Sequence, residues 1–309
     1  MPTIDKISSV LHSNISHLNG LDTNNITSVN GQDFPSGVSL LLDLYGTDIL
    51  AAYSFRKLSS TYSGNAVRVR RTSDNTEQDI GFDGNGDLDT SSLTTFLGSS
   101  DGFITKWYDQ SGNNRDAAQT NASRQIRIAT AGTIETANSL PTTQGANNDA
   151  LIISGIPLTS QPITTFDVYA HFSATLAGNS QTFKGQTSTS SNFIQTRIQR
   201  FVKFGAVTND GTGQVQSFGT TQHRDTDLHV VTRMFNGASS VLRVDQTAET
   251  YNNNPNGGAQ IGGANLDRIG ETSTNSYNGK LSEILVYGAD KTSDFTNIED
   301  NLKTYYSTP

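Results

Sequence analysis

The sequence predicts an all-β protein built as a sandwich of two antiparallel sheets, and three observations lead to this fold class. Hydrophobic residues make up 33% of the chain and charged residues 16%, so neutral polar residues that favour strands and turns fill much of the remainder. Short β-rich runs alternate with Gly-, Asn-, Ser- and Asp-rich turns, as in antiparallel sandwiches. Helical periodicity is confined to two short segments.

The predicted strands are runs rich in β-branched and aromatic residues, and several alternate apolar with polar positions. Turn-forming residues bound each run, and no helix of comparable length separates neighbouring runs as it would in a parallel sheet. In chain order the predicted strands cover residues 38–44, 50–55, 66–70, 103–108, 151–153, 163–172, 228–235, 240–244 and 281–287.

Two segments have helical spacing. Residues 90–97 can be capped by Asp89 or Thr90, and their apolar side chains share one face. Residues 294–305 form the second predicted helix, with apolar positions Phe295, Ile298, Leu302 and Tyr305. Neither helix is large enough to carry a core, so both are expected to pack on the sheets.

Charge and composition exclude several classes of function. Lys and Arg number 21 against 29 Asp and Glu, which gives a net charge of −8 and no basic field for nucleic acid. The chain has no Cys, and no apolar run approaches the roughly 18 residues of a membrane span. The first residues lack the basic and apolar regions of a signal peptide. We therefore expect synthesis in the cytoplasm without a signal peptide, and neither nucleic acid nor membrane as a partner.

Residues 1–36 contain a short tandem repeat. Asn14–Gly20 is echoed by Asn25–Gly31, and each copy ends in Asn-Gly, a pair that favours a tight turn. We interpret residues 1–36 as a segment that attaches to a larger assembly, with a free tail as the alternative. Residues 37–309 then form the sandwich domain. The expected anchor side chains are Ile15, Leu18, Ile26 and Val29.

Several motifs of the sandwich region resemble known families. Ala52–Leu58, Val67–Arg71 and Trp107–Gly112 resemble the catalytic domain of α-L-arabinofuranosidase B, and Tyr-Asp-Gln-Ser-Gly is the most specific part. His229–Gly237 and Asn278–Tyr287 resemble the laminin-G or concanavalin A-like lectin superfamily. Both resemblances imply a concanavalin A-like jelly roll of two antiparallel sheets with a C-terminal helix, preceded here by a short extended N-terminal segment.

Together with the Asn-Gly repeats, the same block resembles structural proteins of tailed phages, notably those of cyanobacteria. This resemblance implies a virion protein: a capsid decoration protein, a head fibre or a tail fibre. Residues 1–36 would anchor it to other virion proteins of the capsid or tail, and the sandwich would be displayed on the virion surface, where it meets host-surface glycans. A homo-oligomer is compatible with this role, although no heptad repeat favours a trimer.

Catalysis by glycosidases needs two carboxyl groups. In the arabinofuranosidase family the nucleophile is a Glu in the middle third, but this chain has no Glu between Glu135 and Glu249. The family's acid/base Asp follows a Gly-Gly pair, where this chain has Ala264; a shifted match at Ile269-Gly retains a carboxylate as Glu271. We therefore expect a non-enzymatic virion protein. The alternatives are a glycoside hydrolase of the α-L-arabinofuranosidase type and a purely structural decoration protein without a ligand.

The histidines belong to no nucleophile motif. His171 and His229 each alternate with an apolar or aromatic residue along a predicted strand. We expect both to be hydrogen-bonded sheet residues rather than metal ligands.

One loop has the pattern of a cation site. Oxygen-bearing side chains at Asp83, Asn85, Asp87 and Asp89 would suit Ca²⁺, which prefers about six to eight oxygen ligands. The loop departs from an EF-hand, because Leu88 stands where its Gly belongs. The alternative is a series of side-chain turns leading into the helix at 90–97. No other cofactor is predicted.

A second candidate site is the only Trp and the polar turn after it. An aromatic face beside amide and carboxylate groups is typical of sugar-binding surfaces. Because neighbouring strand residues point to opposite faces, only one of the two aromatic residues can face a ligand, and the other belongs in the core. The alternative is that the turn only closes a hairpin. The candidate carbohydrate-binding residues are Trp107, Tyr108, Asp109, Gln110 and Asn113.

Overall fold

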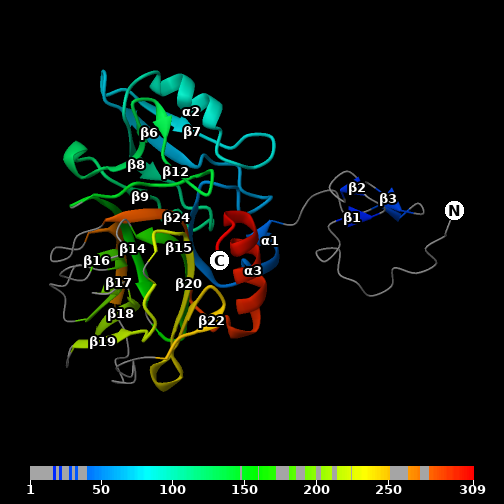
Figure 1. The fold of residues 1–309 in the computed structure, drawn as a ribbon, viewed down its shortest axis with the longest axis vertical. Coiled ribbons are helices and arrows are strands. Elements are labelled where there is room, and N and C mark those ends of the chain that lie inside the picture. The colour runs from blue at the N-terminus through cyan, green and yellow to red at the C-terminus, as the bar shows by residue number, and fades with distance from the viewer. Residues whose placement is uncertain are drawn as a thin grey trace. The chain divides into compact units, whose positions relative to one another are not determined.

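The computed structural model divides the chain into two units, Met1–Leu40 and Leu41–Pro309, so the boundary falls four residues after the expected one at residue 36. The fold of the second unit is drawn in Figure 1. The structure describes residues 17–18, 21–22, 28–29, 32–33, 40–146, 148–158, 160–171, 181–185, 192–199, 203–210, 214–223, 225–250, 264–271 and 278–309.

The helices and the strands up to β13 have the following bounds: α1 (Leu41–Tyr45), α2 (Thr90–Leu97), α3 (Phe295–Tyr306), β1 (His17–Leu18), β2 (Leu21–Asp22), β3 (Ser28–Val29), β4 (Gln32–Asp33), β5 (Ile49–Ser54), β6 (Val67–Arg71), β7 (Glu77–Ile80), β8 (Gly102–Trp107), β9 (Ala117–Ala118), β10 (Ile126–Thr130), β11 (Thr133–Ile134), β12 (Thr136–Ala137) and β13 (Leu140–Pro141).

The remaining strands are β14 (Ala150–Leu158), β15 (Ile163–His171), β16 (Gln181–Gly185), β17 (Asn192–Gln199), β18 (Lys203–Asp210), β19 (Gln214–Phe218), β20 (His229–Phe235), β21 (Val241–Val244), β22 (Thr247–Ala248), β23 (Ala264–Gly270) and β24 (Gly279–Tyr287).

The first unit contains two minimal hairpins. Leu18 pairs with Leu21 in β1–β2, and Val29 pairs with Gln32 in β3–β4. In both hairpins the two residues between the paired positions are Asn-Gly, the sequence that favours a two-residue turn.

Two large antiparallel sheets form the second unit. The order of the six-stranded sheet is β22-β21-β20-β15-β24-β5. The order of the twelve-stranded sheet is β11-β10-β8-β9-β14-β23-β16-β17-β18-β19, with β6 joined to β8 and β7 to β6. One hydrophobic cluster takes side chains from both sheets, among them Tyr53 and Ile284 from one and Trp107 and Ile269 from the other. The predicted two-sheet antiparallel sandwich is confirmed.

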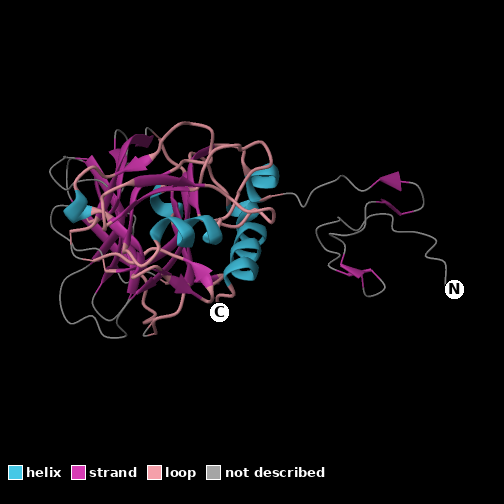
Figure 2. Cartoon of the chain, turned by 90° about the horizontal axis from the view of Figure 1, so that it is seen from above, coloured by secondary structure: helices cyan, strands magenta, loops and turns pink. Residues whose placement is uncertain are grey.

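The six-stranded sheet is buried on both faces. Its second face carries Phe166 and Leu285, which cluster with Ile298 and Leu302 of α3. Figures 1 and 2 show α3 along the outer side of this sheet. Because neither face meets water, every residue of β15 is buried, and the central strands lack the alternation of a half-exposed sheet.

The two predicted helices are confirmed. Helix α2 spans Thr90–Leu97, and the Asp89 side chain accepts a hydrogen bond from Ser92 N at 2.9 Å, which satisfies a free amide at the helix start. Helix α3 begins one residue after Asp294 and places Phe295, Ile298 and Leu302 against the sheet. Tyr306 is buried there more deeply than the expected Tyr305.

The strand predicted at 38–44 is wrong, because residues 41–45 form helix α1. Leu41 and Leu42 are buried while Asp43 and Leu44 are exposed, a pattern that suits one helical turn resting on a core. Several strands of the twelve-stranded sheet were not predicted, among them β10, β23 and the run from β16 to β19, where polar residues fill most positions. In the described part of the chain, the structure contains no helix long and apolar enough to span a membrane.

Candidate active site

A cleft of about 440 Å³ opens at one end of the twelve-stranded sheet. Phe103 of β8 and Arg127 of β10, which pair across the two strands, contribute to its lining. Gln125, Gln144 and Asp149 add polar side chains, of which Asp149 carries the acidic group. A volume of this size, with polar side chains set in a partly apolar lining, suits a small ligand such as a sugar ring.

The wall of the cleft is tied to both sheets. Gln144 N donates to Arg127 O at 2.8 Å, which joins the wall to β10 of the large sheet. Gly145 N donates to Gly279 O at 2.9 Å, and Leu281 N donates to the Thr143 hydroxyl at 2.9 Å, which join it to β24 of the small sheet. The wall is therefore fixed by backbone contacts rather than by long side chains.

Asp149 lies just before β14, and its side chain is poorly solvated. The residue is 8% exposed, and its Oδ2 accepts a hydrogen bond from Ala146 N at 2.8 Å. Burial raises the pKa of Asp149 to about 6, against the lowering effects of the Ala146 amide and of the nearby Arg127 and Arg124. This carboxyl group therefore holds a proton at a pH where ordinary Asp side chains are ionised.

Glu271 is a second buried acid beside Asp149. The pairing of β14 with β23 brings Ala150 opposite Gly270, and Glu271 N donates to Asp149 O at 2.8 Å, so the two acids occupy opposed positions. Glu271 is 8% exposed, and its Oε2 forms an ion pair with the guanidinium of Arg124. The ion pair fixes the direction of this carboxylate.

Gly270 permits the close approach of the two strands. Its φ is +101°, and a Cβ at this position would stand 2.4 Å from Asp149 O. A side chain would therefore have to push the two acidic positions apart, as well as adopt a backbone conformation that other residues avoid.

The arrangement pairs one acid whose pKa is raised with a second acid that forms an ion pair with an arginine. Two carboxyl groups with different protonation states are the requirement for cleaving a glycosidic bond: one protonates the leaving group, and the other acts as nucleophile or base. The sequence prediction missed Asp149 because no motif surrounds it, and its partner lies far along the chain. The shifted match that retained Glu271 was the available signal.

The predicted carbohydrate-binding residues serve the fold. Trp107 has no exposed surface, stacks on Phe55 with ring centroids 4.8 Å apart, and donates its indole N–H to Ser54 O at 3.3 Å. Its ring is therefore not accessible to a sugar. The structure corresponds instead to the alternative of an aromatic core anchor.

Polar side chains of the turn after Trp107 also form hydrogen bonds within the protein. Asp109 accepts hydrogen bonds from Ala52 N and Ser111 N, both at 2.9 Å, and Gln110 accepts one from Leu58 N at 2.9 Å. The exposed Asn113 donates to Ile49 O at 3.0 Å. These groups close the turn against β5.

The other aromatic residue, Tyr108, is only half-buried and donates its hydroxyl to Asp79 at 2.7 Å. Tyr108 and the exposed Asn113 are thus the parts of the predicted patch that keep contact with solvent.

The predicted cation loop forms turns and caps. Asp83 Oδ1 accepts from Asn85 N at 2.8 Å and from Asp87 N at 3.0 Å, while Asp89 caps α2 and the Asp87 carboxylate accepts the hydroxyl of Tyr305. Among the described residues, these acids form no group of three that converges on one point. The geometry is that of the alternative, side-chain turns leading into a helix.

Of the predicted anchor residues, Leu18 and Val29 lie in β1 and β3, whereas Ile15 and Ile26 fall outside the described residues. Their role in attachment, the homo-oligomer, the virion partners, and the expected site of synthesis and display stay predictions that the structure does not test.

Residues 42–160 match the model of the family described as α-L-arabinofuranosidase B, catalytic. No curated protein has a sequence that matches this chain. The match includes β5 to β14 and therefore Asp149, but it ends before Glu271.

Solved structures agree with the family match. An arabinofuranosidase in complex with arabinofuranosyl-α-1,2-xylobiose superposes with a TM-score of 0.62 at 16% identity, covering 85% of this chain and 64% of that one. An α-L-arabinofuranosidase of glycoside hydrolase family 54, soaked with a cyclic sulfate inhibitor, gives a TM-score of 0.59 at 14% identity with the same coverage. The chain thus spans 64% of the length of each enzyme.

These comparisons contradict the prediction of a non-enzymatic phage virion protein. The family match and the two fold matches name arabinofuranosidases, and they name neither a capsid or tail protein nor a laminin-G or concanavalin A-like domain. The error came from giving the Asn-Gly repeats and the missing middle Glu more weight than the catalytic-domain motifs. In sequence over residues 42–160 and in fold over most of its length, the chain is similar to α-L-arabinofuranosidases.

Proposed function

We propose that this protein is a glycoside hydrolase that acts on α-L-arabinofuranosides. The observation that carries the proposal is a pair of buried acids at the ends of β14 and β23: Asp149, which lines the cleft, and Glu271, whose backbone amide donates to Asp149 O. The similarity to arabinofuranosidases supports the choice of substrate class.

Asp149 is the general acid in this proposal. Its raised pKa, about 6, keeps the proton available for the oxygen of the departing group. Glu271 is the nucleophile, because its ion pair with Arg124 fixes the direction of its carboxylate.

These roles differ from those implied by the family resemblance, which would make Glu271 the acid/base. The difference follows from the surroundings of each group, since an arginine contacts Glu271 whereas Asp149 is hydrogen-bonded to a neutral backbone amide.

The test is hydrolysis of two α-L-arabinofuranosides, one with a 4-nitrophenyl leaving group and one with a sugar alcohol leaving group. Asp149→Asn should lower kcat/KM by about 10²–10⁴-fold with the sugar leaving group, and far less with nitrophenol, which needs little protonation. Glu271→Gln should abolish turnover of both substrates, because both need the nucleophile.

Asp267→Asn is the matched control, because Asp267 lies on the same strand as Gly270 but forms a partly exposed ion pair with its neighbour Arg268. It should retain the wild-type rates. No release of arabinose by the folded wild-type protein, or equal losses in Asp149→Asn and Asp267→Asn, would contradict the proposal.

A further inference from the structure

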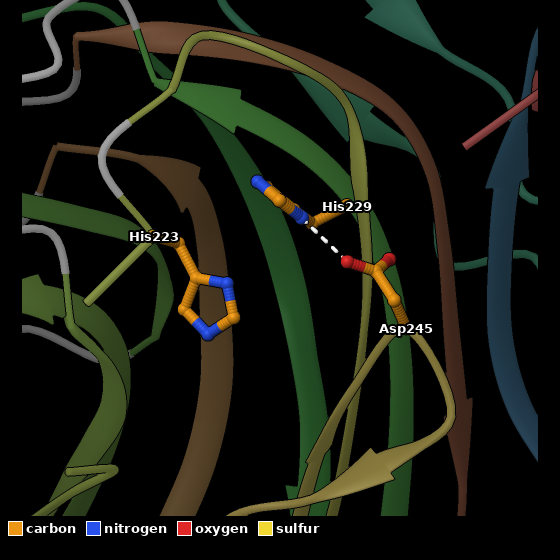
Figure 3. A group of neighbouring side chains, drawn as sticks. All are labelled: His223, His229 and Asp245. Atoms are coloured by element: carbon orange, nitrogen blue, oxygen red, sulfur yellow. Dashed lines mark hydrogen bonds and ion pairs between the residues drawn. The ribbon is translucent and has the colours of Figure 1, made fainter. Parts of the chain in front are cut away.

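A second group of side chains capable of chemistry lies where the two sheets meet, and it uses none of the residues of the cleft. His223 follows β19, His229 begins β20, and Asp245 occupies the turn between β21 and β22. Figure 3 shows the three side chains converging, and one nitrogen or oxygen atom from each lies within 4.8 Å of the other two. The strands that carry them belong to both sheets.

Each histidine has one ring nitrogen held by a carboxylate outside this group. Asp225 Oδ1 lies 2.7 Å from Nε2 of His229, and Glu249 Oε1 lies 3.3 Å from Nε2 of His223. The Nδ1 atoms are therefore the nitrogens left for a ligand, and Nδ1 of His229 is already 2.6 Å from Asp245 Oδ2. In metal centres, outer carboxylates commonly orient the histidine ligands in this way.

The carboxylates are themselves held in place. Asp245 Oδ1 accepts a hydrogen bond from Val230 N at 2.9 Å, which leaves Oδ2 to face the histidines. Glu249 Oε2 accepts a hydrogen bond from Thr221 N at 3.2 Å. Asp245 also has a φ of +49°, a conformation imposed by the tight turn and one that Asp tolerates better than most residues.

An aromatic ring covers one side of the two histidines. The ring of Phe204 lies 5.3 Å from that of His223 and 5.6 Å from that of His229, between centroids. The side chain of His229 is 6% exposed and that of Glu249 is 3% exposed. An apolar floor with few competing waters strengthens the attraction between a cation and these ligands.

We propose that His223, His229 and Asp245 bind one divalent transition-metal ion, of which Zn²⁺ is the type. Two imidazole nitrogens and a carboxylate oxygen suit zinc, whereas Ca²⁺ and Mg²⁺ prefer oxygen ligands throughout. In the bound state each of the three atoms would lie about 2.0–2.2 Å from the ion, the usual bond lengths. The ion replaces the proton between His229 and Asp245, and a water or another group takes the fourth position.

The expected role of the ion is to brace the sandwich. His223 lies in the loop that leads from β19 of the large sheet to β20, while His229 begins β20 and Asp245 occupies a turn of the small sheet. An ion that binds the folded state and not the unfolded chain stabilises the fold. The stabilisation grows with the ion's concentration and with its affinity. The ion therefore joins the ends of the two sheets through coordinate bonds, in a chain without Cys.

The proposal is tested on the full chain after chelation and dialysis. Titration with Zn²⁺ should show one ion bound per chain and a rise in Tm, and Co²⁺ should give the visible absorption of a four-coordinate site with nitrogen ligands. His223→Ala should lose both signals, and Glu249→Gln should weaken binding by about 10–100-fold, as removal of an orienting carboxylate does elsewhere.

Asp227→Asn is the control, because Asp227 is exposed in the same loop as His223 but is not one of the grouped ligands. It should bind as the wild type does. Circular dichroism establishes that each variant is folded, and Asp245→Asn replaces His223→Ala if the latter is not. Equal Zn²⁺ binding by wild type and the ligand variants, or no binding and an unchanged Tm in the wild type, would overturn the proposal.

Discussion

Two buried carboxyl groups of this protein, Glu283 and Asp149, have opposite surroundings. Glu283 of β24 is wholly buried and forms an ion pair with Arg56 at 2.8 Å. It also accepts hydrogen bonds from Ser54 Oγ at 2.8 Å and from the Tyr306 hydroxyl at 3.0 Å. Asp149 is nearly as buried, yet among the described residues its carboxyl accepts a single hydrogen bond, from a neutral amide.

This difference in hydrogen-bond partners distinguishes an acid that stabilises the fold from an acid that can take part in a reaction. The contacts of Glu283 hold α3 to the six-stranded sheet. Tyr306, which donates to Glu283, belongs to the helix, and Arg56, its ion-pair partner, follows β5. Asp149 lies at the edge of a cleft, and its burial raises its pKa. Burial alone therefore does not indicate function; the raised pKa of a buried acid that lines a cleft is the more specific sign.

Removing the partner of Glu283 should have the largest effect on stability. Arg56→Ala leaves a carboxylate buried without its counter-ion, and we expect a loss of about 3–5 kcal/mol in the free energy of unfolding by urea. Asp267→Asn, which breaks a partly exposed pair, should cost no more than about 1 kcal/mol. Equal losses of stability in the two variants would contradict the distinction between the buried and the partly exposed ion pair.

Separating the two strands at the site should come next. In Gly270→Ala the added Cβ meets Asp149 O and the backbone must hold a strained φ, so we expect a loss of about 1–3 kcal/mol. Activity should fall further than stability explains, because the spacing of the two acids changes. Gly112→Ala is the control, since φ is also positive there but no atom lies within 4 Å of its Cβ position. If the two variants retain the same activity, the spacing of the acids does not matter.

The smallest expected effect is the gain in stability when Asp149 is replaced by Asn. The pKa of Asp149 is raised in the folded state to about 6, so the folded protein holds this proton more tightly than the unfolded chain, where Asp titrates near 3.9. The associated stability is full below about pH 4 and is lost as the pH rises through 6. Asp149→Asn should therefore raise Tm by about 2–4 °C at pH 7.5 and leave it unchanged at pH 4. A lower Tm at pH 7.5 would show that the ionised carboxylate is well solvated.

The sequence was most informative where one physical signal dominates. The cap at Asp89 and the apolar spacing after it predicted α2, and the apolar runs at 163–172 and 281–287 predicted the two central strands β15 and β24. It was least informative for β16 to β19, where strand formation depends on pairing with neighbours rather than on apolar side chains.

The site was less predictable than the fold. The prominent Trp107 is a core residue, and its conspicuous turn is closed by internal hydrogen bonds. Asp149 and Glu271 become neighbours only through the register of β14 with β23, and no local pattern encodes that register. The histidine group likewise depends on a turn, a strand start and a loop from different strands, so its alternating sequence pattern gave no sign of it.

The pH dependence of kcat/KM for an arabinofuranoside with a sugar leaving group tests the central claim most directly. If Asp149 is the general acid, the wild-type rate should fall tenfold per pH unit above about pH 6, and Asp149→Asn should lose this limb while keeping a low, flat rate. A limb near pH 6 that persists in Asp149→Asn, or a wild-type profile without one, would contradict the assignment of the acid.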